Sequence, residues 1–158
     1  MIRILVFSDS HGYTVDMIKI IKNIPNVDFI IHLGDVYSDV LNIKKTFPDM
    51  EIHTVCGNND RIPSLETEKL ITVADKKIFI THGHNYSVSY TLKKLTNSTF
   101  AKEADIILYG HTHIPDHFSQ NGKIIANPGS ISRSRYGENS YGVLEIEDGK
   151  AGYANIFI

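Results

Sequence analysis

The segment IRILVFSDSH, residues 2–11, is a short apolar run that ends in polar residues. The run has the length of a buried β-strand, and Asp9 and His11 follow at its carboxyl end. Four further apolar runs end similarly, in carboxylate, amide or imidazole side chains beside a glycine. These four endings are Gly34-Asp35, Gly57-Asn58-Asn59-Asp60, His82-Gly83-His84 and Gly110-His111-Thr112-His113. The repeated pattern predicts strand ends that share one site.

Two stretches between the first three strands have the spacing of amphipathic helices. The first, after the potential cap Thr14 and before Pro25, carries Met17, Ile18, Ile21 and Ile24. The second, after the potential cap Ser38 and before Pro48, carries Val40, Leu41, Ile43 and Phe47. Strands at residues 2–7, 28–33 and 52–55 therefore alternate with helices, which favours a parallel sheet covered by helices.

In the second half of the chain, the sequence pattern predicts a different arrangement of strands and helices. Residues 69–73 and 77–81 indicate two strands joined near Asp75, residues 87–101 a weaker helix, and residues 105–109 another buried strand. Asn121-Gly122 and Asp148-Gly149 each separate two strand-like runs, as in type I′ hairpins. We therefore expect antiparallel pairing toward the C-terminus. The predicted fold is α/β, with two packed mixed sheets and helices outside, in one domain over residues 1–158.

The composition is that of an ordinary globular protein. Apolar residues make up 42% of the 158 residues, charged residues 22%, and the formal net charge is −2. This balance gives no strong signal for binding nucleic acid or an anionic membrane. Cys56 is the only cysteine, which excludes an internal disulfide. No apolar run approaches the roughly 18 residues that span a bilayer, and no signal-peptide pattern is present, so we expect a cytoplasmic protein.

The residues at the strand ends have the chemistry of metal ligands. Sites in α/β sheets form at the carboxyl ends of the strands, so these side chains are expected to converge. Asp9 and His11, like His111 and His113, are two positions apart, and in extended backbone both members of a pair point the same way. Nitrogen and oxygen ligands without sulfur suit Mn, Fe, Zn, Ni or Co. Seven ligands are more than one tetrahedral metal site can use. Their number suits two metal ions that share one carboxylate ligand.

No single motif in this set is specific by itself. An Asp-x-His sequence is usually a turn or a surface feature, Gly-Asp recurs in loops, and Gly-Asn-Asn-Asp favours a turn. Gly110-His111-Thr112-His113 alone is moderate evidence for a metal. The specific signal is the joint occurrence of all five in this order, each after a buried strand.

These motifs, in their order along the chain, resemble those of the calcineurin-like metallophosphoesterase superfamily. The short chain and the Asn127-Pro128-Gly129-Ser130 segment resemble its small prokaryotic phosphodiesterase branch. The resemblance implies a four-layer α/β/β/α sandwich and two divalent metal ions, which we expect to be Mn²⁺, with Ni²⁺, Zn²⁺, Fe²⁺ or Co²⁺ as alternatives. It implies one metal held by Asp9, His11, Asp35 and His113, and the other by Asp35, Asn58, His82 and His111. It also implies a metal-bound hydroxide as the nucleophile.

One position departs from the pattern of many larger family members, which carry a histidine directly after the ligand asparagine. Here that position is Asn59, whose amide does not titrate and cannot supply a proton to the leaving group. The small phosphodiesterase branch also lacks this histidine, so we expect diesters to be preferred over monoesters. Asp60 is expected to orient its neighbours.

Further residues are candidates for contact with the substrate. We expect catalytic roles for Asp35, Asn58, Asp60 and His84, and substrate contacts from Asn59, His84 and Arg135. His84 can move a proton, meet the phosphate or merely support a ligand. Arg135 or Arg133 can meet a phosphate, although a solvated loop arginine is the commoner outcome.

Two alternative functions remain open from the sequence. The same site could serve a phosphomonoesterase or pyrophosphatase. The same fold could also be a protein-binding scaffold, as in a eukaryotic retromer subunit that resembles this family and has an impaired site. All seven ligand positions are filled here, which favours catalysis. The substrate, a small-molecule or nucleotide diester, is not defined further, and a homo-dimer or homo-tetramer is possible.

Overall fold

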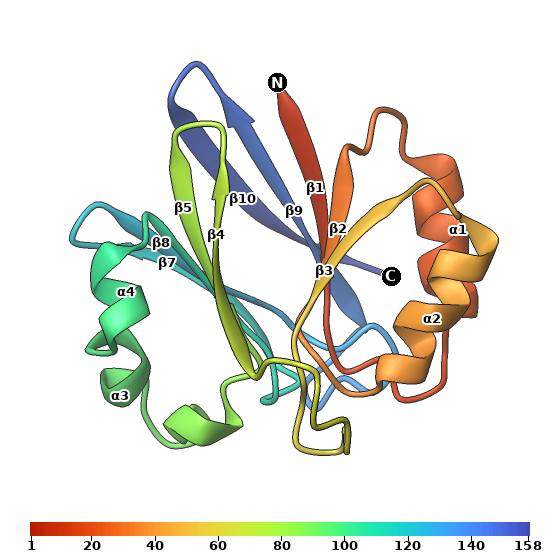
Figure 1. Ribbon diagram of the computed structural model, residues 1–158, viewed down its shortest axis with the longest axis horizontal. Coiled ribbons are helices and arrows are strands. Elements are labelled where there is room, and N and C mark those ends of the chain that lie inside the picture. Colours follow the sequence, from red (N-terminus) through yellow and green to blue (C-terminus); the bar gives the residue numbers. More distant parts are fainter.

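The computed structural model describes residues Met1–Ile158 and has two five-stranded sheets packed face to face (Figure 1). The first sheet has the order β10-β9-β1-β2-β3. Its strands are β1 (Ile2–Phe7), β2 (Phe29–His32), β3 (Glu51–Thr54), β9 (Ser140–Glu147) and β10 (Lys150–Phe157). β1, β2 and β3 pair in parallel, as predicted, and β9 pairs antiparallel with both β1 and β10.

The second sheet has the order β4-β5-β6-β8-β7. Its strands are β4 (Glu68–Val73), β5 (Lys76–Thr81), β6 (Ile106–Tyr109), β7 (Pro115–Gln120) and β8 (Lys123–Pro128). The two predicted hairpins are confirmed, since both residues of each turn have positive φ. β6 pairs in parallel with both β5 and β8, so this sheet is mixed, as predicted, and the antiparallel pairs are β4–β5 and β7–β8. β6 is buried along its whole length, as is usual for parallel strands.

Helices cover the outer face of each sheet, which completes the four-layer α/β/β/α sandwich (Figure 1). α1 (Val15–Asn23) and α2 (Tyr37–Thr46) lie on the first sheet, where Met17 and Ile43 are buried with Leu5 and Phe7. α3 (Lys93–Thr96) and α4 (Thr99–Glu103) lie on the second. None of these helices has the length and apolar character needed to cross a lipid bilayer.

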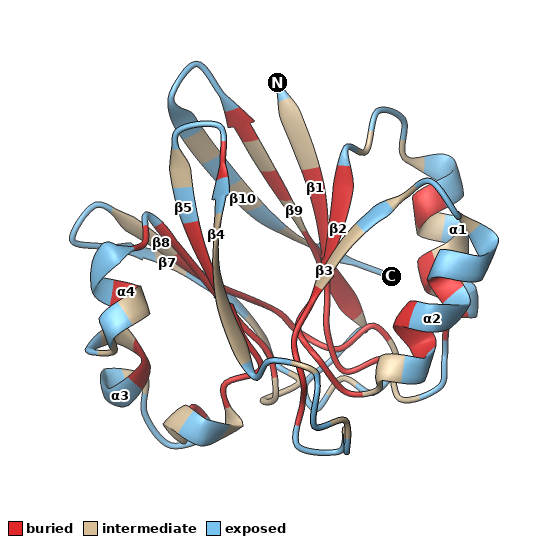
Figure 2. Ribbon diagram, in the orientation of Figure 1, coloured by how far each residue is buried: buried red, intermediate tan, exposed pale blue.

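The central core lies between the two sheets. β1 contributes Ile4 and Val6 to it, while β5 and β6 contribute Ile80 and Leu108. Figure 2 shows buried residues continuing from these strands into the loops at their carboxyl ends. The loops that follow the carboxyl ends of these strands therefore start from a rigid, close-packed core.

The local helix signals were less accurate than the strand signals. α2 begins at Tyr37, so Ser38 lies inside the helix and the predicted Ser38 cap is wrong. The Asp60 carboxylate accepts the Tyr37 N–H at 2.7 Å and takes the role of the cap. Thr14 does occupy the N-cap position of α1, but its hydroxyl accepts from Asn42 Nδ2 at 2.7 Å and bonds no α1 N–H.

The single helix predicted over residues 87–101 is also wrong. The structure has a one-turn 3₁₀ helix at His84–Tyr86 (η1), followed by the short helices α3 and α4. Ser87 has φ of 57°, which ends the first turn. Ser98 starts α4 afresh, because its hydroxyl accepts the Ala101 N–H at 3.3 Å.

A candidate metal centre at the strand ends

The predicted ligand residues lie in the loops that leave the carboxyl ends of β1, β2, β3, β5 and β6. These loops gather at one end of the two-sheet core, at the bottom of Figure 1. The residues brought together are Asp9, His11, Asp35, Asn58, His82, His111 and His113. Asp9 and His82 are fully buried, whereas His11 and His113 are partly open to solvent.

Asp9 is at the centre of the cluster. Its Oδ1 lies 3.2 Å from His113 Nε2 and 4.0 Å from His11 Nε2. The same oxygen lies 3.9 Å from His82 Nε2, and it is buried without a hydrogen-bond donor. A buried carboxylate oxygen without a donor is costly, so this arrangement calls for a cation.

Backbone carbonyls fix the orientation of two of these imidazoles. His82 Nδ1–H donates to the Leu33 carbonyl and His113 Nδ1–H to the Arg133 carbonyl, each at 2.7 Å. In the neutral tautomer, Nε2 of each ring then presents a lone pair to the cluster. This is the usual way in which proteins orient histidine ligands toward a metal.

The second half of the cluster brings together Asp35, Asn58, His82 and His111. His82 Nε2 lies 3.6 Å from Asp35 Oδ2 and 3.1 Å from Asn58 Oδ1. His111 Nδ1 lies 2.9 Å from the same Asn58 oxygen. Four side chains from four loops thus direct oxygen or nitrogen atoms at one another, a donor set that fits a divalent transition metal.

The pKa values of the cluster reflect the buried carboxylate at its centre and the histidines around it. Burial alone would raise the pKa of Asp9, but contacts with His113, His82 and the Ser8 hydroxyl outweigh it and lower that pKa. Contact with the Asp9 carboxylate raises the pKa of His113. Burial lowers the pKa of His11 and of His111, which favours the neutral form that a metal requires.

The backbone of the ligand loops is left-handed and not extended. Asp9, His11, His111 and His113 have φ of 55°, 45°, 69° and 60°. The expectation that an extended backbone points each pair the same way is therefore wrong, although the side chains do converge. Such conformations cost of order 1–3 kcal/mol each and persist at functional sites, where the surrounding structure imposes them.

Hydrogen bonds from a neighbouring loop hold Asp35. The Asp60 carboxylate accepts the N–H groups of Asp35 at 3.1 Å and Gly57 at 2.9 Å, in addition to that of Tyr37. Asn59 donates its backbone N–H to Asp35 Oδ1 at 2.9 Å and its amide to Oδ2 at 2.6 Å. Asp60 thus binds the backbone on both sides of Asp35 through hydrogen bonds, and the direct contact of Asn59 with the Asp35 side chain was not predicted.

Three serines that support Asp9 were not predicted. Ser8 donates to Asp9 Oδ2 at 2.6 Å, which leaves only Oδ1 free. Ser130 and Ser132, from the loop before β9, donate to the carbonyls of Asp9 and Ser10, each at 2.8 Å. The Asn127-Pro128-Gly129-Ser130 segment was the only sequence signal for this contact, since more than 100 residues separate the partners.

His84 and Arg135 lie at the edge of the cluster. The His84 ring is 5.4 Å from that of His82 and 6.2 Å from that of His111, and its buried Nδ1 has no hydrogen-bond partner. Burial lowers the pKa of His84. Arg135 is exposed, and its N–H donates to the His113 carbonyl at 3.2 Å. Arg133 lies over the Tyr13 ring, 5.9 Å from its centroid.

His32 lies below the cluster and is almost fully buried. Its Nδ1 accepts the Gly34 N–H at 3.3 Å, so Nε2–H donates to Ser10 Oγ at 3.0 Å. Burial lowers the pKa of His32 to about 4, against 6.5 for the unperturbed group. The folded state therefore excludes a proton that the unfolded chain binds below about pH 6.5.

This exclusion predicts a loss of stability in acid. Because the folded pKa lies below the unfolded value, the contribution is lost as the pH falls from about 6.5 toward 4. Between pH 7 and pH 5 the loss from His32 is about 2 kcal/mol. Urea unfolding of the metal-free protein at both pH values measures it, and His32→Gln should lose about 2 kcal/mol less than the wild type. Equal losses in the two proteins would contradict this assignment.

The fold is a four-layer α/β/β/α sandwich, and its strand ends carry a candidate metal centre of Asp, His and Asn. Together these features define the class of protein as one with a metal site at the carboxyl ends of two packed sheets. The model of the calcineurin-like phosphoesterase superfamily domain matches residues 2–149. The chain belongs to this superfamily.

Individual relatives agree with this assignment. A probable metallophosphoesterase of Bacillus subtilis is 34% identical, over 94% of this chain and 87% of its own length. A phosphodiesterase of Methanocaldococcus jannaschii is 29% identical, over 92% of this chain and 93% of its own. The crystal structure of a predicted phosphoesterase from Streptococcus pneumoniae superposes with a TM-score of 0.78 at 30% identity. That match covers 98% of this chain and 88% of the other.

Proposed function

We propose that this protein is a phosphodiesterase that uses two divalent metal ions, and that Mn²⁺ is the native metal. The observation that carries the proposal is Asp9 Oδ1, which is buried without a donor and faces the Nε2 atoms of three histidines at 3.2–4.0 Å. The phosphodiesterase of Methanocaldococcus jannaschii supports the choice of diesters.

The seven side chains divide into two overlapping ligand sets. Asp9, His11, Asp35 and His113 hold one ion, and Asp35, Asn58, His82 and His111 hold the other. Asp35 is the shared ligand in this proposal. In the metal-free chain, the groupings Asp9–His11–His113 and Asp9–Asp35–His82 instead have Asp9 in common. Asn59 donates to both oxygens of Asp35, and each oxygen has a second lone pair that would be available to a metal ion.

The bound ions supply Lewis acidity, which polarises phosphoryl oxygens and lowers the pKa of water toward 7. The protein's contribution is to fix the ligands before substrate arrives. Asp60 holds the Asp35 loop through the N–H groups of Asp35 and Tyr37, and backbone carbonyls hold the rings of His82 and His113. Such preorganisation spares the reaction the cost of ordering these groups.

The residues around the ligands fit a diester better than a monoester. Asn59 offers no proton for a poor leaving group, and it is held against Asp35. His84 borders the ligands with a lowered pKa and an unpartnered Nδ1. In this proposal His84 contacts the substrate phosphate or moves a proton, and Arg135 contacts a part of the substrate farther from the ions.

A substrate panel with different metals tests this function. We expect hydrolysis of bis(p-nitrophenyl) phosphate in the presence of Mn²⁺ and its loss with a chelator, because the ions supply the Lewis acidity. The diester should be cleaved with a higher kcat/KM than p-nitrophenyl phosphate. A preference for the monoester would contradict the diesterase subclass alone. Absence of turnover with every divalent metal on a broad ester panel would contradict the enzymatic function.

A further inference from the structure

A cavity of about 330 Å³ lies beside the metal centre, between the segment after η1 and the start of β7. Its apolar wall includes Val88, Leu92 and Ile114, and Tyr90 and Tyr109 add aromatic rings. Asp116 and Arg135 add opposite charges to the same lining. The cavity therefore combines apolar surface with groups that can accept and donate hydrogen bonds.

The cavity is continuous with the ligand loops. Thr112 and Ile114, which line it, alternate along the chain with the ligands His111 and His113. Arg135 is tied to the same loop by its N–H bond to the His113 carbonyl. Val88 packs against Gly83, since a β-carbon there would lie 2.9 Å from Val88 Cγ2. A molecule whose phosphate meets the metals can thus extend directly into the cavity.

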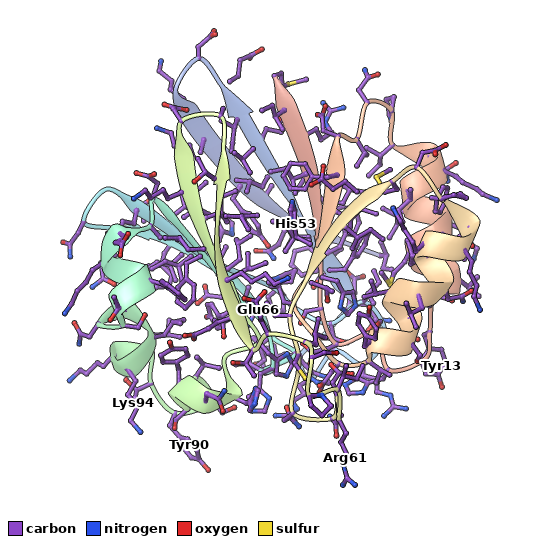
Figure 3. The ribbon with its side chains drawn as sticks, viewed as in Figure 1. Tyr13, His53, Arg61, Glu66, Tyr90 and Lys94 are labelled. Carbon is purple, nitrogen blue, oxygen red and sulfur yellow. The ribbon has the colours of Figure 1, made fainter.

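The size and lining of the cavity indicate what it accommodates. Pockets of roughly 300–1,000 Å³ hold organic ligands, so a phosphate group alone would leave this one largely empty. Tyr90 is 92% exposed, an unusual state for a large ring, and Figure 3 shows it projecting at the end of the molecule where the site loops lie. An exposed tyrosine beside hydrogen-bonding groups can stack a planar base.

We propose that this cavity binds the nucleoside of a nucleotide phosphodiester, an inference that rests on the proposed diesterase function. The base stacks on Tyr90, and its polar edge meets the Asp116 carboxylate and the Arg135 guanidinium. The phosphate then lies at the metal centre, beyond Thr112. The cavity makes the enzyme selective for diesters that carry a nucleoside over those that carry a small alkyl group.

Two esters with the same leaving group test the inference. The p-nitrophenyl ester of thymidine 5′-phosphate and ethyl p-nitrophenyl phosphate differ only in the group that the cavity would hold. We expect the wild type to have a kcat/KM about tenfold higher for the thymidine ester. Tyr90→Ala should remove most of this ratio. Tyr136→Ala, which changes a tyrosine that is 80% exposed and outside the cavity lining, should keep it.

The possible outcomes separate the two proposals. Equal kcat/KM values for both esters, or a ratio that survives Tyr90→Ala, would overturn the nucleoside site and leave the diesterase function intact. Turnover of neither ester would count against the diesterase function. In that event, calorimetric titration with thymidine 5′-phosphate tests the cavity directly. Binding weakened about tenfold by Tyr90→Ala supports the site, and no binding, or equal binding by both proteins, overturns it.

Discussion

Replacing Asp35 by Asn is expected to lower kcat/KM for an aryl phosphodiester by at least about a thousandfold. The substitution removes the charge of the ligand proposed to join the two ions while keeping its size. Lewis acidity is worth several kcal/mol of transition-state stabilisation, and each 1.36 kcal/mol is a factor of ten in rate. Asn keeps the side-chain oxygen that can accept the Asn59 N–H, so the fold should survive.

Initial rates at saturating Mn²⁺, with thermal unfolding measured in parallel, check this expectation. Asp49→Asn is a matched control, because Asp49 is exposed and remote from the ligand loops. A variant at Asp35 that kept more than about a tenth of the activity would contradict the bridging role. If Asp9→Asn were then the more damaging change, Asp9 would be the shared ligand, as in the metal-free groupings.

Gly57→Ala should also disable the site, although position 57 carries no ligand. A β-carbon there would overlap Asp35 Oδ1 and lie 2.7 Å from both Cγ and N of Asp35. The Asp35 carboxylate or its loop must move, and a displacement of about 1 Å in a catalytic group can cost about a hundredfold in rate. The overpacking should also cost about 1–3 kcal/mol of stability.

Gly152→Ala is the control for this substitution. A β-carbon at position 152, in the edge strand β10, would meet no atom within 4 Å. Activity and urea-unfolding midpoints of both variants make the comparison. We expect a large loss in both quantities for Gly57→Ala and little change for Gly152→Ala. Wild-type activity in Gly57→Ala would show that Asp35 tolerates displacement and is not held as tightly as the geometry indicates.

The strand ends were the part of the fold that the sequence predicted best. An apolar run such as residues 4–7 is buried on both faces, so its pattern depends little on distant partners. The seven residues predicted as ligands could be singled out because each lies within a few positions of the end of such a run. The β6–β8 parallel pairing was missed because hairpin signals are local, whereas this pairing joins strands separated by a whole intervening strand.

The hydrogen bonds that hold the predicted ligands could not be predicted from local sequence patterns, because their partners lie in other loops. Asp60 caps α2 from a different loop and replaces the Ser38 cap that proximity favoured. Ser130 and Ser132 bond the backbone of the β1 loop across more than 100 residues. Asp9 and His111 have left-handed backbone, which non-glycine residues rarely adopt alone, and tertiary bonds hold both: Ser130 donates to the Asp9 carbonyl and the His111 N–H donates to Asp9 Oδ2.

The most direct test of the dinuclear centre is the number of metal ions that the active protein binds. Metal-free protein is titrated with Mn²⁺, and bound metal and diester hydrolysis are measured on the same samples. We predict two ions per chain, with activity reaching its maximum as the second ion binds. Full activity with one ion per chain, or in the metal-free protein, would contradict the proposed centre.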